Sequence, residues 1–569
     1  MSGDVASSAA AANRTHARGK RHKRAWYVDS VMCARWWGFA ALLATACSDP
    51  AVTQGNGVGA GSSGGDDGST TANDATTAGM SGTVTTEADA STGPAGPIPA
   101  AGISVDWVEA NQAVGVRIGQ DGGGVGGEDR TSPLIANRIT LVRAFWDIPE
   151  DWQPREIEAH FTVNFPDGTS DTKIDRKMVE GPSFIGNLQE AFFWGLMPEE
   201  AQPGLTYHIE LFETDASFAD PSVTAPPRLP EDGSEAFVGI EDSYQLLKVV
   251  LVPFNYDDGA DCVTQPDTSE ETMQLFEDYL YMMNPVDRVE MTIHESVDWP
   301  DPLTSFVPLN QYMAQIRFDE EAPAETYYYG LVDVCDGGLG GAGGLANGIP
   351  QDPTSPDVAY QRVSSGLSLD PEWSAETFVH EVGHSQGRRH VACNGEEGGP
   401  DPSYPIEGGD LGEWGFGVVD FQLRHPTVYK DYMTYCNPAW VSTWGLNKVF
   451  PVIRALSMWD ENYPGADGVR PEPTGSLVLV GNVLPGGEEA WYTVPGALTG
   501  RATGTVEFET EAGTLAQPAE ISDLPDAQGT MIVAEVPAPL STVRSLVRVE
   551  GPTRTAIDLN TIRVRQPAR

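Results

Sequence analysis

Three histidines and one glutamate are spaced as in sites that bind a metal ion and activate water. Residues 380–390 read His-Glu-Val-Gly-His-Ser-Gln-Gly-Arg-Arg-His, and this stretch holds three of the nine histidines in the 569-residue chain. Residues four apart lie on the same face of a helix, so His380 and His384 can direct both imidazoles at one metal ion. Glu381 follows the first ligand, so we expect its carboxylate to reach the attacking water and to serve as general base.

The two ends of this predicted helix fit the same arrangement. Asp370 is placed to cap the N-terminus, and Pro371 suits the first helical position. Gly387 falls where the helix should end, because glycine adopts positive φ without strain. The resulting turn would bring back His390 as the third ligand. Three protein ligands leave the fourth position open, as a catalytic zinc site requires, so we predict one catalytic Zn²⁺.

The stretch 380–390 resembles the signature of the metzincin metallopeptidases. That clan also has a Met-turn, which places a methionine beneath the zinc ligands, and residues 431–436 (Asp-Tyr-Met-Thr-Tyr-Cys) resemble it. The resemblance implies that Met433 is the Met-turn methionine. It also implies that Tyr435 binds zinc or stabilises the tetrahedral intermediate. The alternative for Tyr435 is a side chain that only packs in the turn.

The resemblance covers residues 246–465 approximately and implies an α+β metzincin-like catalytic domain. Val391, after the third histidine, matches none of the common family-specific residues. The glycine- and aromatic-rich run 408–417 is loosely similar to the mucin-peptidase-like group of secreted bacterial metzincins. The subfamily, and with it the substrate sequence, does not follow from these residues.

Two segments before the predicted helix bear on substrate and cofactor. Metzincins align extended substrates on an edge strand, and we predict that residues 358–363 form it. The glycine-rich segment 337–348 formally contains a dinucleotide-binding pattern. That pattern needs a helix directly after it, and Asn347, Gly348 and Pro350 would break one. We therefore predict a loop near the cleft rather than a nucleotide site.

The N-terminus has the features of an export signal. Arg35 precedes an apolar run from Trp36 to Ala46 that is too short to span a bilayer. The run leads into Leu-Ala-Thr-Ala-Cys, which resembles a bacterial lipobox and implies lipidation of Cys47. We predict an exported lipoprotein at the cell surface or outer membrane, attached only through this lipid. Plain secretion after cleavage nearby, or an uncleaved anchor, are the alternatives.

The composition excludes one class of partner. The chain has 82 acidic and 34 basic residues and a formal net charge of −48. Such a surface repels nucleic acid and anionic lipid headgroups, so we exclude nucleic-acid binding. The acidity suits an extracellular protein, and acidic loops would offer structural Ca²⁺ sites, although no EF-hand spacing is present. We expect a monomer.

The cysteines predict disulfide bonds. Four cysteines follow Cys47, an even number in a chain that we expect to be exported, and four cysteines allow three connectivities. We favour Cys393–Cys436, which would tie the chain after the third ligand to the Met-turn, with Cys262–Cys335 as the second bridge. A cysteine zinc site is disfavoured because the usual C-x-x-C pairs are absent.

Composition and periodicity divide the remaining chain. Residues 48–100 are rich in Gly, Ser, Thr and Ala and predict a disordered tether. Apolar residues alternate with polar ones from Ile157 to Phe165, which predicts a β-sandwich with His160 and His208 on its polar faces. The predicted parts are a signal peptide (1–47), a tether (48–100), a β-sandwich (101–243), a peptidase domain (244–465), a linker (466–475) and a small C-terminal β-domain (476–569).

The combined prediction is a zinc metalloendopeptidase that hydrolyses peptide bonds in extracellular protein or glycoprotein substrates. Glu381 would deprotonate the attacking water and pass the proton to the leaving amine. The main alternative is a catalytically silent adhesion or glycan-binding protein on the same scaffold, and a third is a hydrolase of non-peptide amides. The predicted fold class is multidomain, with an α+β metzincin-like catalytic domain between an N-terminal β-sandwich and a small C-terminal β-domain.

Overall fold

The computed structural model describes residues 96–563, apart from 336–337, 340, 394, 396–397, 465–470, 472, 525 and 527–528. The predicted signal peptide at 1–47, the lipidation of Cys47 and the tether up to residue 95 lie outside these residues, as does most of the linker at 466–475. None of the described helices has the length and hydropathy that crossing a bilayer requires.

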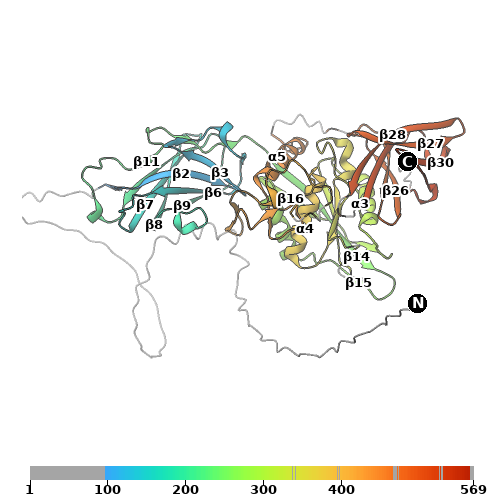
Figure 1. Ribbon diagram of the computed structural model, residues 1–569, viewed down its shortest axis with the longest axis horizontal. Coiled ribbons are helices and arrows are strands. Elements are labelled where there is room, and N and C mark those ends of the chain that lie inside the picture. Colours follow the sequence, from blue (N-terminus) through green and yellow to red (C-terminus); the bar gives the residue numbers. More distant parts are fainter. Residues whose placement is uncertain are drawn as a thin grey trace, which may run out of the picture. The chain divides into compact units, whose positions relative to one another are not determined.

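Two sheets that share one hydrophobic core form the first part of the described chain (Figure 1). In one sheet, β7 (Arg155–Asn164) pairs with β8 (Ser170–Val179) and β10 (Thr206–Glu213). Along β7 every second residue from Ile157 to Val163 is buried, because successive side chains of a strand face opposite sides. The strands of the other sheet are β2 (Ser104–Asn111), β3 (Gly115–Gln120), β4 (Gly123–Gly124), β6 (Thr140–Asp147) and β9 (Phe192–Leu196).

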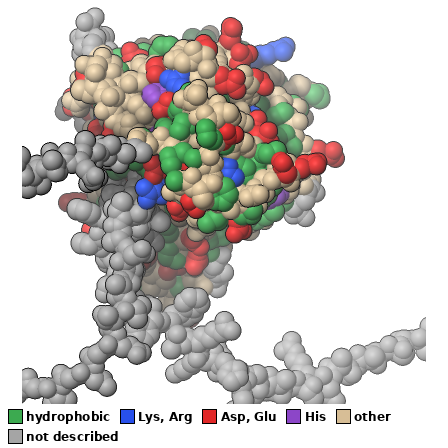
Figure 2. All heavy atoms as spheres, turned by 90° about the vertical axis from the view of Figure 1, so that its left-hand side faces the viewer, with side chains coloured by type: hydrophobic (Ala, Val, Ile, Leu, Met, Phe, Trp, Pro, Cys, Tyr) green, Lys and Arg blue, Asp and Glu red, His purple; other side chains and the backbone are tan. Residues whose placement is uncertain are grey.

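The end of the molecule formed by these sheets faces the viewer in Figure 2, where acidic side chains are spread among apolar and neutral ones, with few basic side chains between them. This distribution agrees with the strongly negative formal charge of the sequence. Charges of one sign on a surface favour solubility and disfavour anionic partners.

A central sheet carries the candidate site. Its strands are β14 (Leu246–Asp257), β15 (Val263–Thr264), β16 (Arg288–Ile293), β17 (Val297–Trp299), β18 (Tyr327–Val332), β19 (Gly344–Ala346) and β20 (Val363–Leu367). β14, β18 and β20 are parallel neighbours, and β18 and β20 are buried at every residue, as parallel strands with both faces covered require. β19 pairs antiparallel with β20 and ends the sheet on that side.

Four helices accompany this sheet: α2 (Glu270–Met283), α3 (Val307–Asp319), α4 (Pro371–Ser385) and α5 (Thr443–Ser457). The helix predicted to carry the metal ligands is α4. Its N-terminus is capped by Asp370, whose carboxylate accepts hydrogen bonds from the backbone N–H groups of Glu372 and Trp373 at 3.2 and 3.3 Å. This confirms the predicted cap. Phe378 of α4 contacts Phe276 of α2 and Tyr329 of β18, at ring-centroid distances of 5.2 and 4.5 Å, which fixes the helix against the sheet.

A third sheet closes the described chain, in the order β26-β25-β29-β28-β27-β30-β31 (red in Figure 1). It is curved into a half-barrel, and Tyr492 at one edge forms a bridge with Arg563, just beyond the strand at the other edge. Its strands are β25 (Leu477–Val483), β26 (Glu489–Pro495), β27 (Ala502–Thr510), β28 (Gly513–Leu524), β29 (Gly529–Glu535), β30 (Val543–Glu550) and β31 (Thr553–Ile557). Shorter strands elsewhere are β1 (Ile98–Pro99), β5 (Leu134–Ile135), β11 (Arg228–Leu229), β12 (Ala236–Phe237), β13 (Ile240–Glu241), β21 (Gly415–Gly417), β22 (Gln422–Arg424), β23 (Lys430–Asp431) and β24 (Ala439–Trp440).

The predicted fold class is wrong. Strand is about twice as abundant as helix among the described residues, at 38% against 18%. These residues do not form an α+β metzincin-like catalytic domain. The central sheet also does not have a core of its own, because one hydrophobic cluster contains both Val252, Phe254 and Val363 of that sheet and Val480 and Val533 of the half-barrel. The apolar runs after residue 476 therefore complete the core beneath the candidate site. The domain boundaries themselves stay predictions.

The predicted substrate-aligning edge is also misplaced. Most of residues 358–363 belong to a 3-10 helix (Pro356–Gln361) that precedes β20, and β20 lies between β18 and β19. The edge strand is β19, inside the glycine-rich segment that we predicted to be a loop. A strand forms there because Leu345 pairs with Ser365 of β20 and its side chain is buried in the shared core.

Candidate metal centre

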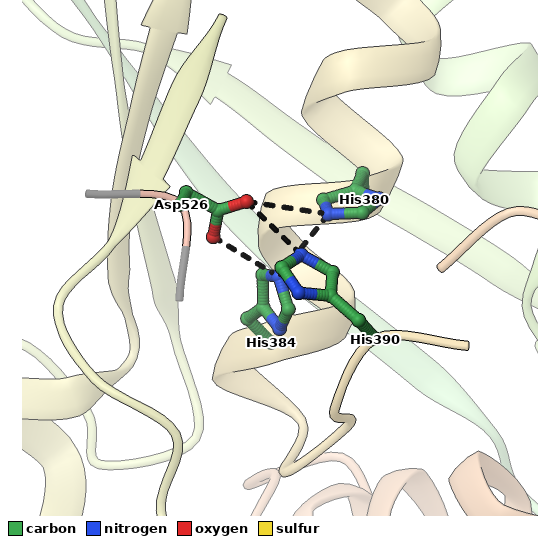
Figure 3. Close-up of side chains that lie close together, drawn as sticks. All are labelled: His380, His384, His390 and Asp526. Atoms are coloured by element: carbon green, nitrogen blue, oxygen red, sulfur yellow. Dashed lines mark hydrogen bonds and ion pairs between the residues drawn. The ribbon is translucent and has the colours of Figure 1, made fainter. Parts of the chain in front are cut away.

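The structure brings the three predicted ligands together on α4 and the turn that follows it. The side-chain Nε2 atom of His384 lies 3.1 Å from that of His380 and 3.2 Å from that of His390 (Figure 3). All three imidazoles are almost completely buried. Three imidazole nitrogens at these distances can bind a single ion, and imidazole is a preferred ligand of zinc and of several other transition metals.

Each ring is held by its other nitrogen. The Nδ1 atoms of His380, His384 and His390 lie 2.8, 2.7 and 3.0 Å from the backbone carbonyl oxygens of Tyr432, Arg388 and Gly398. A carbonyl oxygen only accepts hydrogen bonds, so each Nδ1 must carry the proton. In the neutral imidazole, Nε2 then presents a lone pair, and three lone pairs face one another. A metal cation satisfies this arrangement, so the residues fit the predicted metal.

Gly387 makes the turn that returns His390. Its φ is +85°, in the left-handed region that glycine adopts without strain. A Cβ atom at this position would also come within 3.0 Å of Pro353 Cγ and 3.3 Å of the Pro350 carbonyl oxygen. The predicted role of Gly387 in ending α4 agrees with this geometry.

A fourth residue, which the sequence did not reveal, completes the group. Asp526 lies in the turn between β28 and β29, and Figure 3 shows its carboxylate pointing at the three imidazoles. Its Oδ1 is 3.0 Å from His390 Nε2 and 3.8 Å from His380 Nε2, and its Oδ2 is 3.2 Å from His384 Nε2. The four ligand atoms lie within 4.8 Å of one another, so this set can hold a metal ion.

Burial and charge favour the protonation states that bind a metal. Burial lowers the pKa of His384 to about 4, so this imidazole is uncharged at neutral pH. Burial alone would raise the pKa of Asp526, but the charge of His384 when it is protonated, and then hydrogen bonds from the imidazoles, hold that pKa well below the usual range. At neutral pH the cluster therefore presents a neutral imidazole at His384 and an ionised carboxylate at Asp526.

Glu381 lies beside the cluster but is not part of it. Its side chain is buried against β19, where a Cβ atom on Gly344 would come within 2.6 Å of its Oε1. Burial, and after it the negative charge of Asp526, raise the pKa of Glu381 well above the usual range, while a hydrogen bond from the backbone of Ala346 opposes this shift. The carboxylate thus contacts the edge strand and lies close enough to Asp526 for their negative charges to interact.

The segment predicted to be a Met-turn lies under α4. Met433 is fully buried, and its Sδ would be 2.6 Å from a Cβ atom placed on Gly383 of that helix. The Met433 carbonyl oxygen accepts a hydrogen bond from the backbone N–H of Val391, directly after the third histidine. Tyr435 is 44% exposed, its ring lies 4.6 Å from that of His390, and its hydroxyl donates to Asp526 Oδ1 at 2.8 Å. Its predicted role toward a reaction intermediate stays a prediction.

Both predicted disulfides are confirmed. Cys262 is bonded to Cys335, and Cys393 is bonded to Cys436. The second bridge joins the chain just past His390 to the segment that contains Met433 and Tyr435. It therefore covalently links the two loops that support the metal group.

Other predicted features fall outside this cluster. His160 and His208 pair with Glu158 and Glu235, at 2.6 and 2.9 Å, and take no part in the metal group. The structural Ca²⁺ stays a prediction. No family model matches the chain, and no curated protein matches it. The assignment of the site therefore depends on its own geometry.

Glu376, in the first turns of α4, gives a test of how the stability of the fold depends on pH. Burial, and then the negative charges of Glu372 and Asp370, raise the pKa of Glu376 from 4.5 to about 7. Between pH 4.5 and 7 the carboxyl group of Glu376 binds a proton in the folded protein but not in the unfolded chain. Its contribution to the stability of the fold is therefore fully present below pH 4.5 and is lost as the pH rises through 7.

Replacing Glu376 with glutamine should therefore raise the melting temperature at pH 8 and leave it unchanged at pH 4. We expect an increase of about 2–4 °C in the melting temperature, which corresponds to about 1 kcal/mol in a domain of roughly 150–250 residues. The effect is this small because solvent screens the charge of a partly exposed group. Thermal unfolding followed by circular dichroism at both pH values measures it. An equal shift at pH 4 and pH 8 would show that the charge of Glu376 is not the cause.

Proposed function

We propose that the chain is a metal-dependent hydrolase of peptide bonds, with zinc as its metal. The observation that supports this most directly is the convergence of three tautomer-fixed Nε2 atoms beside the buried carboxylate of Glu381. A divalent ion held by His380, His384 and His390 would supply Lewis acidity at this position. A structural metal site would need no general base next to its ligands.

The residues of the chain divide the remaining work. Glu381 accepts a proton from the attacking water and returns it to the leaving amine, as a positioned carboxylate general base does. β19 is the end strand of the central sheet and lies directly beside Glu381. An extended peptide that pairs with the edge of β19 opposite β20 would place a backbone carbonyl near the base, which is why we propose peptides as substrates.

The location belongs to the same proposal. Disulfides persist in oxidising compartments, so the Cys262–Cys335 and Cys393–Cys436 bonds support an exported protein that acts on extracellular proteins or glycoproteins. The lipid anchor at Cys47 and the monomeric state belong to the same proposal, and Cys47 lies outside the described residues.

The test is cleavage of an unfolded protein with and without a chelator. The purified chain is loaded with Zn²⁺ and incubated with denatured casein, and new N-termini are quantified. We expect cleavage by the Asp526→Ala variant described below, and weaker cleavage by the wild-type chain, that 1,10-phenanthroline abolishes and that added Zn²⁺ or Co²⁺ restores. Cleavage that persists after complete removal of metal would contradict the proposed function, as would the absence of cleavage in both the wild-type chain and the Asp526→Ala variant described below.

A further inference from the structure

We propose that Asp526 is the fourth ligand of the metal and closes the centre to any incoming ligand, so that the chain folds in a latent form. As a statement about regulation, this inference rests on the proposed function. As a statement about coordination, it rests on the position of one carboxylate and can be tested without catalysis.

The first argument is the geometry of the carboxylate. Its two oxygens reach the Nε2 atoms of His390 and His384 at 3.0 and 3.2 Å, and the side chain is only 7% exposed. The carboxylate therefore faces the same point as the three imidazole lone pairs. Catalytic zinc sites have three protein ligands and one open position, whereas sites with four protein ligands are closed. With Asp526 included, this group is of the closed kind.

The second argument is that the partners of the carboxylate among the described residues do not explain its burial. The hydroxyl of Tyr435 donates to Oδ1 at 2.8 Å, and its ion-pair contacts in this part of the chain are with the three histidines. These histidines have already used their Nδ1 protons on backbone carbonyls. A buried carboxylate that faces lone pairs is costly unless a cation lies between them. Metal ligation removes that cost.

The third argument is that both strands of the hairpin carrying Asp526 are anchored in the core. Leu524 and Met531, in the two strands that flank the turn, are buried in the core shared with the central sheet. Met531 also packs against Gly348, just after β19, where a Cβ atom would lie 2.4 Å from its Sδ.

This anchoring has a consequence for substrate. An acyl group that approaches Glu381 and the metal must take the place that the Asp526 carboxylate occupies. The hairpin cannot leave by a rotamer change alone, because Leu524 and Met531 hold its two strands in the core. Activation therefore requires either a local rearrangement of the turn or a change in the chain that frees Asp526.

The experiment compares the Co²⁺-substituted wild-type protein with the variants Asp526→Ala and Asp526→Asn. Co²⁺ reports its coordination through its visible absorption spectrum, and acetohydroxamate serves as a small ligand that needs an open position. The matched control is Asp523→Asn, which removes one negative charge from the same hairpin at an exposed position. Circular dichroism confirms that each variant is folded.

We expect Asp526→Ala to change the Co²⁺ spectrum and to bind acetohydroxamate at least tenfold more tightly than the wild-type protein. Asp526→Asn, which keeps the size of the side chain but loses the charge, should lie between them, and Asp523→Asn should match the wild type. Equal acetohydroxamate affinity in the wild type and in both Asp526 variants, with an unchanged spectrum, would overturn the inference.

Casein cleavage by the same proteins separates this inference from the proposed function. Tighter acetohydroxamate binding together with cleavage that rises at least tenfold supports both. Tighter binding with no cleavage in any variant supports Asp526 as the closing ligand and counts against a peptidase. Cleavage by the wild type that equals that of Asp526→Ala supports the peptidase and overturns the closing role of Asp526.

Discussion

Replacing Glu381 with glutamine should lower the rate of peptide-bond hydrolysis by on the order of 10²–10⁴-fold while the protein keeps its metal. A general base contributes a factor of this size, and glutamine retains the shape of the side chain but cannot accept the proton. The three imidazoles are held by the carbonyl oxygens of Tyr432, Arg388 and Gly398, none of which Glu381 contacts, so the metal site should be preserved.

The comparison is best made in the Asp526→Ala background as well as in the wild type, so that it does not depend on whether Asp526 limits activity. Metal content per chain is measured by atomic emission, and activity is measured as casein cleavage. His384→Ala provides the contrasting result, since it should lose both metal and activity. Full activity in Glu381→Gln with bound metal would rule out the proposed role of the carboxylate.

The largest expected effect on stability is at Arg388. Its guanidinium donates to Asp431 Oδ1 at 3.1 Å, and both side chains are almost fully buried. Asp431 also accepts hydrogen bonds from the backbone N–H of Met433 at 3.0 Å and from the Ser442 hydroxyl, so this pair ties the end of α4 to the segment below the metal group. Arg388→Ala leaves a buried carboxylate without its cation, which costs about 3–5 kcal/mol.

The chain offers a matched control in the neighbouring residue. Arg389 is exposed, whereas Arg388 is 3% exposed, and both are arginines in the same turn. Guanidinium-induced unfolding should therefore show a clearly lower midpoint for Arg388→Ala, and a free energy of unfolding within about 0.5 kcal/mol of the wild type for Arg389→Ala. Similar midpoints for the two variants would mean that the buried pair does not support the site.

The local parts of the site could be predicted from the sequence because each depends on residues close together in the chain. The i, i+4 spacing places His380 and His384 on one face of α4, and Gly387 has the positive φ that its position after the helix suggested. The Asp370 cap and the two disulfides follow from similarly simple rules of residue type and number.

Asp526 could not be predicted in the same way. It lies 136 residues after His390 and sits in a hairpin turn, where aspartate is common for reasons unrelated to metals. No spacing rule relates a residue in one sheet to ligands on a helix that packs beside another sheet. We predicted an open fourth position from the sequence, and only the fold brings a carboxylate to it.

The errors in the fold have a comparable origin. The apolar alternation after residue 476 correctly predicted strands, but alternation does not reveal which core an apolar face will join, and here Val480 and Val533 join that of the central sheet. The edge strand β19 was missed because glycine is unfavourable in strands, and the pairing with β20 outweighs this preference.

The shared core also sets an order of events during synthesis. The ribosome releases the chain from its N-terminus, so the three histidines emerge before the half-barrel that covers the hydrophobic residues beneath them. A nascent chain that ends before residue 476 would leave Val252 and Phe254 partly exposed to water and would depend on chaperones rather than on its own packing. Asp526 arrives among the last strands, so the step that completes the fold is also the step that delivers the carboxylate to the histidines.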